Sequence, residues 1–299
     1  MRAFLAFFAL ILLTLAVAAG LAWPAWELLT PQFDLRFHRV ASRVWMLLVL
    51  IGIVLLARRL AVADRGSLGY GAPRRIFLRE TGIGLALGVT TMLPIVLLMF
   101  AAGLRASRAD VALDTATLLR LAAAGLGTGL TVALIEETFL RGAMHSAVQR
   151  ESGPVVAILL IAPLYAATHF LASYRIPPGQ LGPGSGFDLL AGSLAAFGQP
   201  LSIIDAFLCL TAVGVLLGLV RALTGNIAAC IGLHAGWVWV ISVVREASRP
   251  VADHPAGWLL SDFDGVVGWL VLAWCGVIGA VLVRFYRYRD ASTVRENLV

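Results

Sequence analysis

The sequence predicts an all-α, polytopic membrane protein, a bundle of about eight transmembrane helices. Hydrophobic residues make up 60% of its 299 residues and charged residues only 13%, whereas charged residues typically form about 25% of a soluble domain. The mean hydropathy is +0.90. The apolar residues also occur in runs of about 20, the length that an α-helix needs to span the hydrocarbon core of a bilayer.

Eight apolar runs approach this spanning length. The first is longer than the hydrophobic core of a signal peptide, usually about 7 to 15 residues, so we expect an uncleaved helix. The second is the shortest, and the Gly- and Pro-rich segment 173–202 predicts a loop with room for a short re-entrant segment. The expected helices cover residues 3–23, 44–57, 81–104, 118–144, 154–174, 203–223, 227–244 and 266–283.

The positions of the arginines orient the predicted bundle. Short cytoplasmic loops carry an excess of positive residues, and assigning alternate connections to one side places 14 of the 23 basic residues there, six of them in the loop from Arg58 to Arg79. Both termini are then expected in the cytoplasm. The basic residues lie at the ends of apolar runs and form no patch with interleaved aromatic residues, so the net charge of +6 does not indicate nucleic-acid binding.

Neither internal repeats nor low-complexity tracts divide the chain, so residues 1–299 are expected to form a single membrane domain. The three cysteines, Cys209, Cys230 and Cys275, lie inside apolar runs and show no paired spacing. This pattern predicts free cysteines in the core, with neither a disulfide framework nor a thiolate metal site.

The fourth apolar run contains adjacent carboxylates and an arginine, in the segment ALIEETFLRGAMH. A charged side chain at the centre of a membrane helix costs at least about 2.5 kcal/mol on insertion scales, so such residues need a reason. Glu137 and Arg141 are four residues apart, on one helical face, in the favourable order for an ion pair. Glu136 is rotated by about 100° from Glu137 and has no charged neighbour three or four residues away.

Two histidines in other apolar runs are the candidate partners of Glu136. Glu136 and His169 are equally far in sequence from the turn centred between Ser152 and Gly153, so they are expected at equal depth on antiparallel helices. His234 lies about ten residues beyond the next turn on the same side. We therefore expect Glu136, His169 and His234 to meet, because each lacks a partner on its own helix.

A desolvated carboxylate beside imidazoles suits general-base chemistry. The hypothesis is that Glu136 deprotonates a water held between it and His169, that the water attacks a peptide carbonyl, and that His234 stabilises the oxyanion. A cavity open to the cytoplasmic side would supply the water. No cofactor is required.

These residues also carry a family resemblance. EETFLRG resembles the EExxxR motif of the CAAX-protease and bacteriocin-processing (CPBP, or ABI) family, and HFL with TGNIAACIGLHAGW is similar to its second and third motifs. The resemblance implies an eight-helix intramembrane glutamic endopeptidase whose motif-bearing core spans residues 118–244. It implies metal-independent cleavage, which in CAAX prenyl endopeptidases removes a C-terminal tripeptide after a prenylated Cys. By motif position, Glu136 would be catalytic, Glu137 and Arg141 its supports, and His169 and His234 the histidines of the later motifs.

Two positions depart from the family pattern. Tyr165 replaces a common Phe, whereas Val238 replaces a common Asn that would be a second oxyanion donor; losing such a donor costs about 100- to 1,000-fold in rate. An indole N–H of Trp237 or Trp239 is one possible replacement.

Several alternatives therefore stay open. They are a zinc-dependent intramembrane peptidase, which would use Glu and His ligands without an H-E-x-x-H motif, and a non-catalytic scaffold or immunity-type protein of the same fold. The expected surroundings are the lipid bilayer, specifically a bacterial cytoplasmic membrane. The expected substrate is a peptide or lipidated protein of unspecified identity, and the sequence leaves the oligomeric state open.

Overall fold

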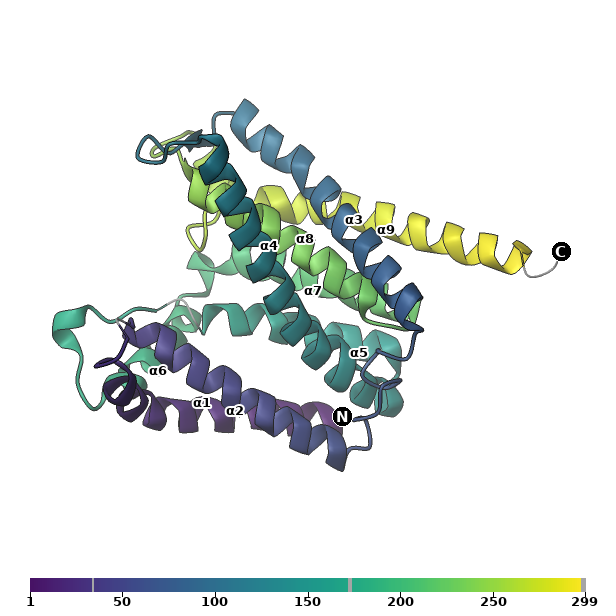
Figure 1. Ribbon diagram of the computed structural model, residues 1–299, viewed down its shortest axis with the longest axis horizontal. Coiled ribbons are helices and arrows are strands. Elements are labelled where there is room, and N and C mark those ends of the chain that lie inside the picture. The colour runs from purple at the N-terminus through teal and green to yellow at the C-terminus, as the bar shows by residue number, and fades with distance from the viewer. Residues whose placement is uncertain (34, 172–173, 297–299) are drawn as a thin grey trace.

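The structure, a computed structural model, describes residues 1–33, 35–171 and 174–296, with side chains up to residue 286. Its elements are almost all helical (Figure 1). In order they are α1 (Arg2–Leu29), α2 (Phe37–Arg59), α3 (Arg74–Ala101), β1 (Arg105–Ser107), α4 (Thr115–Glu137), the π-helix η1 (Thr138–Met144), α5 (His145–Phe170), η2 (Pro178–Gln180), α6 (Ser185–Ala195), η3 (Ala196–Gly198), η4 (Pro200–Ser202), α7 (Ile204–Thr224), α8 (Ala228–Ala247), β2 (Ser248–Pro250), η5 (Gly257–Leu259) and α9 (Trp269–Glu296).

Within the described residues, seven helices are long and apolar enough to cross a membrane. One of them, Thr115–Phe170, is 56 residues long and contains both the fourth and the fifth predicted spans. It is broken at Gly153, where φ is 83° and ψ is 166°, a conformation that glycine adopts without a Cβ penalty. The all-α polytopic class predicted from the sequence is confirmed, and the chain is an integral membrane protein.

Close backbone contacts fix α8 between α3 and α4, which flank it in Figure 1. A Cβ atom at Gly84 of α3 would lie 2.5 Å from the carbonyl oxygen of Ala229, and one at Gly129 of α4 would lie 2.6 Å from that of Ala235. From α8 itself, a Cβ at Gly232 would meet the backbone nitrogen of Leu85 at 2.6 Å. Small residues permit this approach in membrane helices, and here they set the depth of α8.

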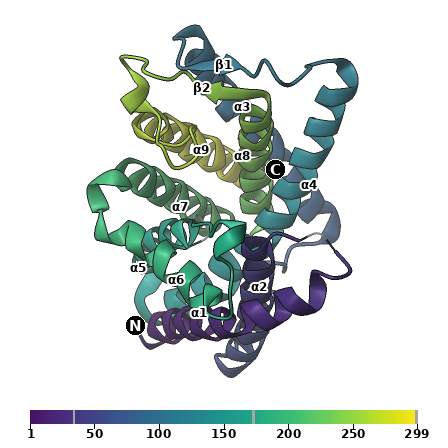
Figure 2. The ribbon, with the colours of Figure 1, turned by 90° about the vertical axis from the view of Figure 1, so that its left-hand side faces the viewer.

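The segment predicted as the loop 173–202 contains the helix α6. This helix packs against α1, near α2 (Figure 2), at Gly186, where a side chain would collide with the carbonyl of Ala19. The prediction that this segment is not a membrane span is confirmed for its described residues, where α6 has only 11 residues. The segment is more helical than a loop, because Gly186 serves a helix contact rather than a turn.

A short antiparallel ribbon that the sequence did not predict joins the ends of α3 and α8, with Arg105 of β1 opposite Pro250 of β2. The buried Arg105 side chain donates hydrogen bonds to the hydroxyl of Ser248 at 3.0 Å, to its carbonyl oxygen at 3.0 Å and to that of Gly265. A buried guanidinium needs such acceptors. The ribbon and Arg105 thereby hold the ends of α3 and α8 together.

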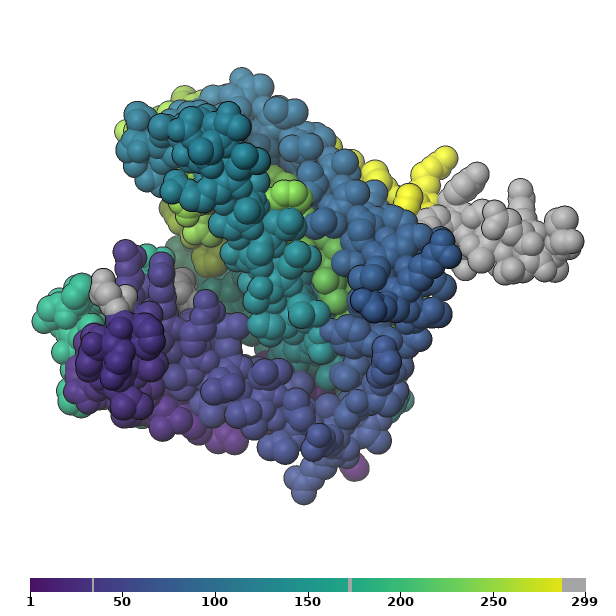
Figure 3. All heavy atoms as spheres, in the orientation of Figure 1, coloured from purple at the N-terminus to yellow at the C-terminus, as the bar shows by residue number. Residues whose placement is uncertain are grey.

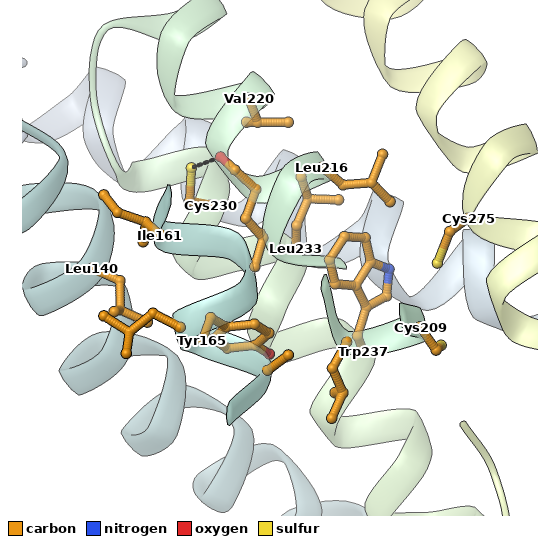
Figure 4. Close-up of a cluster of buried hydrophobic side chains, with 14 of the residues drawn as sticks. Leu140, Ile161, Tyr165, Cys209, Leu216, Val220, Cys230, Leu233, Trp237 and Cys275 are labelled. Carbon is orange, nitrogen blue, oxygen red and sulfur yellow. Dashed lines mark hydrogen bonds between the residues drawn. The ribbon is translucent and has the colours of Figure 1, made fainter. Parts of the chain in front are cut away.

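The expectation for the three cysteines is confirmed. Cys209, Cys230 and Cys275 are free and buried. They lie in the apolar cluster drawn in Figure 4, where the Cys230 thiol donates to the carbonyl oxygen of Leu217 at 3.4 Å. Outside this core, the molecular surface is recessed between the α1–α2 pair and α4 (Figure 3).

Candidate active site

A cavity of about 380 Å³ lies among α3, α4, α5, α7, α8 and α9. Glu136, His169 and His234 line what we call its inner end. The cavity then follows α8 away from the loop that precedes α3, and reaches Arg245 in the last turn of α8. The lining residues therefore run towards the ribbon end of the bundle, away from the arginine-rich loop that the sequence analysis assigned to the cytoplasm. The cytoplasmic opening of the cavity stays a prediction.

Glu137 is the most enclosed residue of the candidate site. Its side chain is 0% exposed, and its Oε1 accepts from Arg141 Nη1 at 3.1 Å and from His234 Nδ1 at 2.8 Å. Arg141, also buried, donates through Nη2 to the carbonyl oxygen of Gly214 at 3.1 Å. The predicted Glu137–Arg141 ion pair is thus present. Two cationic or polar donors around one carboxylate compensate its loss of hydration.

His234 has a partner that the sequence argument did not foresee. We expected His234 to contact Glu136, but its closer contact is with Glu137. The rotation of α8 about its axis directs Nδ1 of His234 to that buried carboxylate. A carboxylate paired with Arg141 accepts rather than donates, so Nδ1 of His234 carries a hydrogen; Nε2 is an acceptor when the ring is neutral and a donor when the ring is doubly protonated. Nε2 lies 3.9 Å from Oε2 of Glu136, beyond hydrogen-bond distance.

Glu136 differs from its neighbour by facing the cavity. Its side chain is 32% exposed and lines the cavity, whereas that of Glu137 is 0% exposed and does not; Oε2 of each carboxylate is buried without a hydrogen-bond partner among the residues that the structure describes. A buried carboxylate oxygen in this state needs a water or ligand hydrogen to satisfy it. Glu136 is therefore the carboxylate of this pair that is available to a molecule in the cavity.

His169 lines the same cavity from α5. Its Nδ1 lies 2.9 Å from the carbonyl oxygen of Tyr165. Because a carbonyl only accepts, Nδ1 carries the hydrogen, and Nε2 of the neutral ring is again the acceptor. The backbone of α5 thus fixes the tautomer of His169 in the way that Glu137 fixes that of His234.

Tyr165 connects these groups, a role for which the sequence offered no signal beyond an aromatic residue in the second motif. Its buried ring lies edge-on to His169, with centroids 4.6 Å apart, and to His234, 6.0 Å apart. The guanidinium carbon of Arg141 lies 4.8 Å from the ring centroid, within the range of a cation–π interaction. The ring therefore holds both imidazoles and the arginine in place.

The π-helix η1 follows the two glutamates directly. π-helical turns are rare and frequent at functional sites. In η1, the Thr138 hydroxyl lies 2.5 Å from the Tyr70 hydroxyl, and a Cβ at Gly142 would lie 2.8 Å from the carbonyl oxygen of Leu68. The segment before α3 therefore supports the turn that presents Glu136 and Arg141.

Val238 lines the cavity wall where the family pattern has Asn. The Trp237 indole cannot replace the missing amide, because its Nε1 already donates to the hydroxyl of Thr91 at 3.1 Å. Ser242, one turn beyond Val238 on the same face of α8, also lines the cavity. The sequence analysis missed this hydroxyl, although its spacing of eight residues from His234 indicated a shared face.

The alternative of a zinc-dependent peptidase depends on whether His, Cys, Asp and Glu side chains are grouped to bind a metal ion. In the part of the chain that the structure describes, no group of three or more His, Cys, Asp and Glu side chains is arranged to hold a metal ion. The geometry thus offers no observation that favours a zinc site over the arrangement of two carboxylates and two imidazoles described above.

A family model described as Type II CAAX prenyl endopeptidase Rce1-like matches residues 118–240. No curated protein and no solved structure was found to match the chain. The matched segment includes Glu136, Glu137, Arg141, His169 and His234, and it lies within the core expected at 118–244. Residues 118–240 are therefore similar to the Rce1-like type II CAAX prenyl endopeptidases, the protease family that the three motifs resemble.

Proposed function

We propose that the protein is an intramembrane endopeptidase in which Glu136 acts as the general base that activates a water. The observation that carries the proposal is the contrast between the two glutamates. Glu137 is fully buried and does not line the cavity, and its Oε1 accepts from Arg141 and His234. Glu136, by contrast, is 32% exposed and borders the cavity. General-base catalysis needs a carboxylate that is free to take a proton.

The Nδ1–H tautomer of His169 supports its role in holding the water, and the hydrogen bond from His234 Nδ1 to Glu137 leaves Nε2 of His234 for the oxyanion. A water that donates one hydrogen to Glu136 and the other to Nε2 of His169 directs its oxygen lone pairs away from both acceptors, towards a bound peptide carbonyl. Transfer of the first hydrogen to Glu136 accompanies attack. His234 stabilises the tetrahedral oxyanion as a donor through Nε2, which requires its doubly protonated form, with Nδ1 still bound to Glu137. Glu137 and Arg141 position His234 and do not touch the substrate.

The substrate is a peptide or lipidated protein that enters from the bilayer, and the proposed location is a bacterial cytoplasmic membrane. The apolar side chains along the cavity, contributed by α7 and α9, support an apolar substrate segment. A non-catalytic role of the same fold is the second candidate, and Val238 is the observation that favours it, because the wall beside His234 lacks an amide donor.

The decisive experiment replaces Glu136 by Gln in cells and compares the membrane peptides by mass spectrometry of protein termini. Glutamine keeps the shape of the side chain but cannot act as a base, so cleavage is expected to fall by about 100-fold or more, and uncut substrates should accumulate. His169→Ala should act in the same direction.

Glu246→Gln is the matched control, because Glu246 is exposed on α8 and does not line the cavity. Its set of cleaved termini should equal that of the wild type. Unchanged termini in both the Glu136→Gln and the His169→Ala cells would leave the non-catalytic role.

A further inference from the structure

The outer end of the cavity is charged, unlike its apolar middle. We give this name to the end lined by Ser242, Arg245 and Asp264. Arg245 and Asp264 also line an adjoining surface pocket of about 600 Å³ beside the ribbon, together with Arg105, Arg108, Asp110 and Arg249. The catalytic cavity therefore continues into a pocket with four arginines and two aspartates.

The arginines of this pocket differ in their existing contacts. Arg105 is committed to carbonyl and hydroxyl oxygens of the ribbon, and Arg108 forms an ion pair with Asp110 at 2.6 Å. Neither the Arg245 nor the Arg249 side chain has a hydrogen-bond or ion-pair partner among the described residues, although the backbone of Arg249 pairs with that of Ala106 in the ribbon. Asp264 forms no ion pair with Arg245 among the described residues: its Oδ1 instead accepts from the backbone nitrogens of residues 266 and 267, each at 2.9 Å.

A purely structural reading of Arg245 is that a cation in the last turn stabilises the end of α8 through the helix dipole. That reading explains a charge at this position, but not why the charge borders the cavity that contains Glu136. An exposed guanidinium at the end of an apolar passage is instead suited to a substrate that is apolar along its length and anionic at one point.

We propose that Arg245, assisted by Arg249, binds a carboxylate of the peptide substrate at the outer end of the cavity. The proposal rests on the endopeptidase function above and specifies its substrate: an apolar peptide with a carboxylate at a fixed distance from the cleaved bond. Guanidinium and carboxylate form charge-assisted, often bidentate hydrogen bonds that fix orientation as well as affinity.

The length of α8 sets that distance. His234 and Arg245 are 11 residues apart on one helix, which corresponds to about 16 Å along its axis. An extended peptide covers this length in about five residues. A carboxylate at Arg245 therefore places the fourth or fifth peptide bond before it at Glu136, a longer released fragment than the tripeptide that the family resemblance implies.

The test uses purified full-length protein in lipid nanodiscs and N-acylated apolar decapeptides with either a C-terminal carboxylate or a C-terminal amide. A third set carries the amide and one Glu near the C-terminus, to separate a terminal carboxylate from an acidic side chain. Mass spectrometry gives the rate and the position of cleavage. We expect the carboxylate peptides to be cleaved about tenfold faster than the plain amides, four or five residues before the charge.

Two variants separate Arg245 from general effects of charge. Arg245→Gln should remove the preference for carboxylate over amide while leaving the amide peptides cleaved, and Arg249→Gln should weaken it. Arg120→Gln is the matched control, because Arg120 is exposed on α4 and borders neither pocket. Equal cleavage of carboxylate and amide peptides by the wild type would overturn the proposal, as would a full preference in the Arg245→Gln protein.

A binding assay that needs no catalysis separates the carboxylate site at Arg245 from the endopeptidase function on which it rests. A benzophenone-labelled carboxylate peptide is cross-linked to the Glu136→Gln protein, with unlabelled carboxylate or amide peptide as competitor. If the carboxylate peptide competes more strongly than the amide, and this difference is lost in the Glu136→Gln, Arg245→Gln double variant, the carboxylate site at Arg245 is supported. This holds even if the wild type cleaves no peptide, and in that case only the endopeptidase function fails. Equal competition by the two peptides, with displacement by phosphatidylglycerol vesicles, would assign the arginines to lipid and overturn the site.

Discussion

The two halves of α8 have opposite environments. Every residue from Ala228 to Trp237 is buried, and this inner half is held by backbone contact with α3 and α4. From Val238 onward the helix is mostly half-buried or exposed, and its free face lines the cavity as far as Arg245.

The two halves of α8 meet different requirements: the inner half positions the buried charged groups, and the outer half borders the cavity through which a peptide would pass. The inner half carries His234, whose hydrogen bond to Glu137 needs a fixed depth and rotation, and the glycine contacts supply both. The outer half must leave space for a peptide, so it has fewer packed partners. Stability and substrate access are thus assigned to different halves of one helix, and substitutions in them should have different consequences.

The largest effect on stability is expected from Arg141→Met in η1, whose partner Glu137 binds His234 of the inner half of α8. The change leaves the fully buried Glu137 carboxylate without its cationic partner, and breaking a buried pair from one side costs about 3–5 kcal/mol. Unfolding of the purified protein in detergent, followed by circular dichroism, measures the loss. Arg245→Gln at the outer half should change stability by only about 0.5 kcal/mol, because the side chain is exposed.

The double variant Arg141→Met, Glu137→Gln is the control for this explanation. Glutamine removes the uncompensated charge, so the double variant should regain a large part of the lost stability. If it is no more stable than Arg141→Met alone, the loss comes from packing of the arginine and not from its charge.

A smaller effect is expected from Gly232→Ala. The new Cβ would meet backbone atoms of α3, which cannot rotate away, and such overpacking typically costs about 1–3 kcal/mol. Separation of α3 from α8 should also move His234 away from Glu137 and reduce any cleavage activity. The same unfolding measurement applies, combined with the cleavage assay.

Gly127→Ala in α4 is the matched control, since no atom lies within 4 Å of a Cβ built there. Alanine favours a helix interior over glycine by about 0.5–1 kcal/mol, so this variant should be neutral or slightly more stable. Equal destabilisation by the two alanines would show that contact with α3 does not set the position of α8.

The features of the fold and of the candidate site that the sequence predicted depend on residues that are close together in the sequence. The apolar runs predicted the membrane helices, and the separation of four residues predicted the Glu137–Arg141 pair, because both depend on the geometry of a single helix. The turn at Gly153 was visible for the same reason: a Gly-Pro pair interrupts one long helical run.

The features that the sequence did not predict depend on contacts between segments that are distant in sequence. His234 reaches Glu137 only because the glycines of three helices set the rotation of α8, and no local pattern encodes that rotation. The ring of Tyr165 and the π-helix η1 take their roles from neighbours in other segments. The ribbon joins strands of three residues each, which are too short for a periodic signal.

A smaller effect on stability than that of Gly232→Ala is expected from Val238→Asn, which tests whether the outer half of α8 limits catalysis. Val238 is half-buried, so the substitution should change stability by no more than about 1 kcal/mol. Its amide would enter the cavity one turn from His234 and add a donor for the oxyanion. We expect the cleavage rate of a substrate found with Glu136→Gln to rise about tenfold.

Val243→Asn is the control for this substitution, because Val243 is half-buried in the same half of α8 but does not line the cavity. It should leave the rate unchanged. A rise with both variants would reflect general loosening of the outer half. If the rate rises with neither, the cavity wall at Val238 does not face the reacting carbonyl, and the oxyanion must be stabilised by His234 together with a hydroxyl such as that of Ser242.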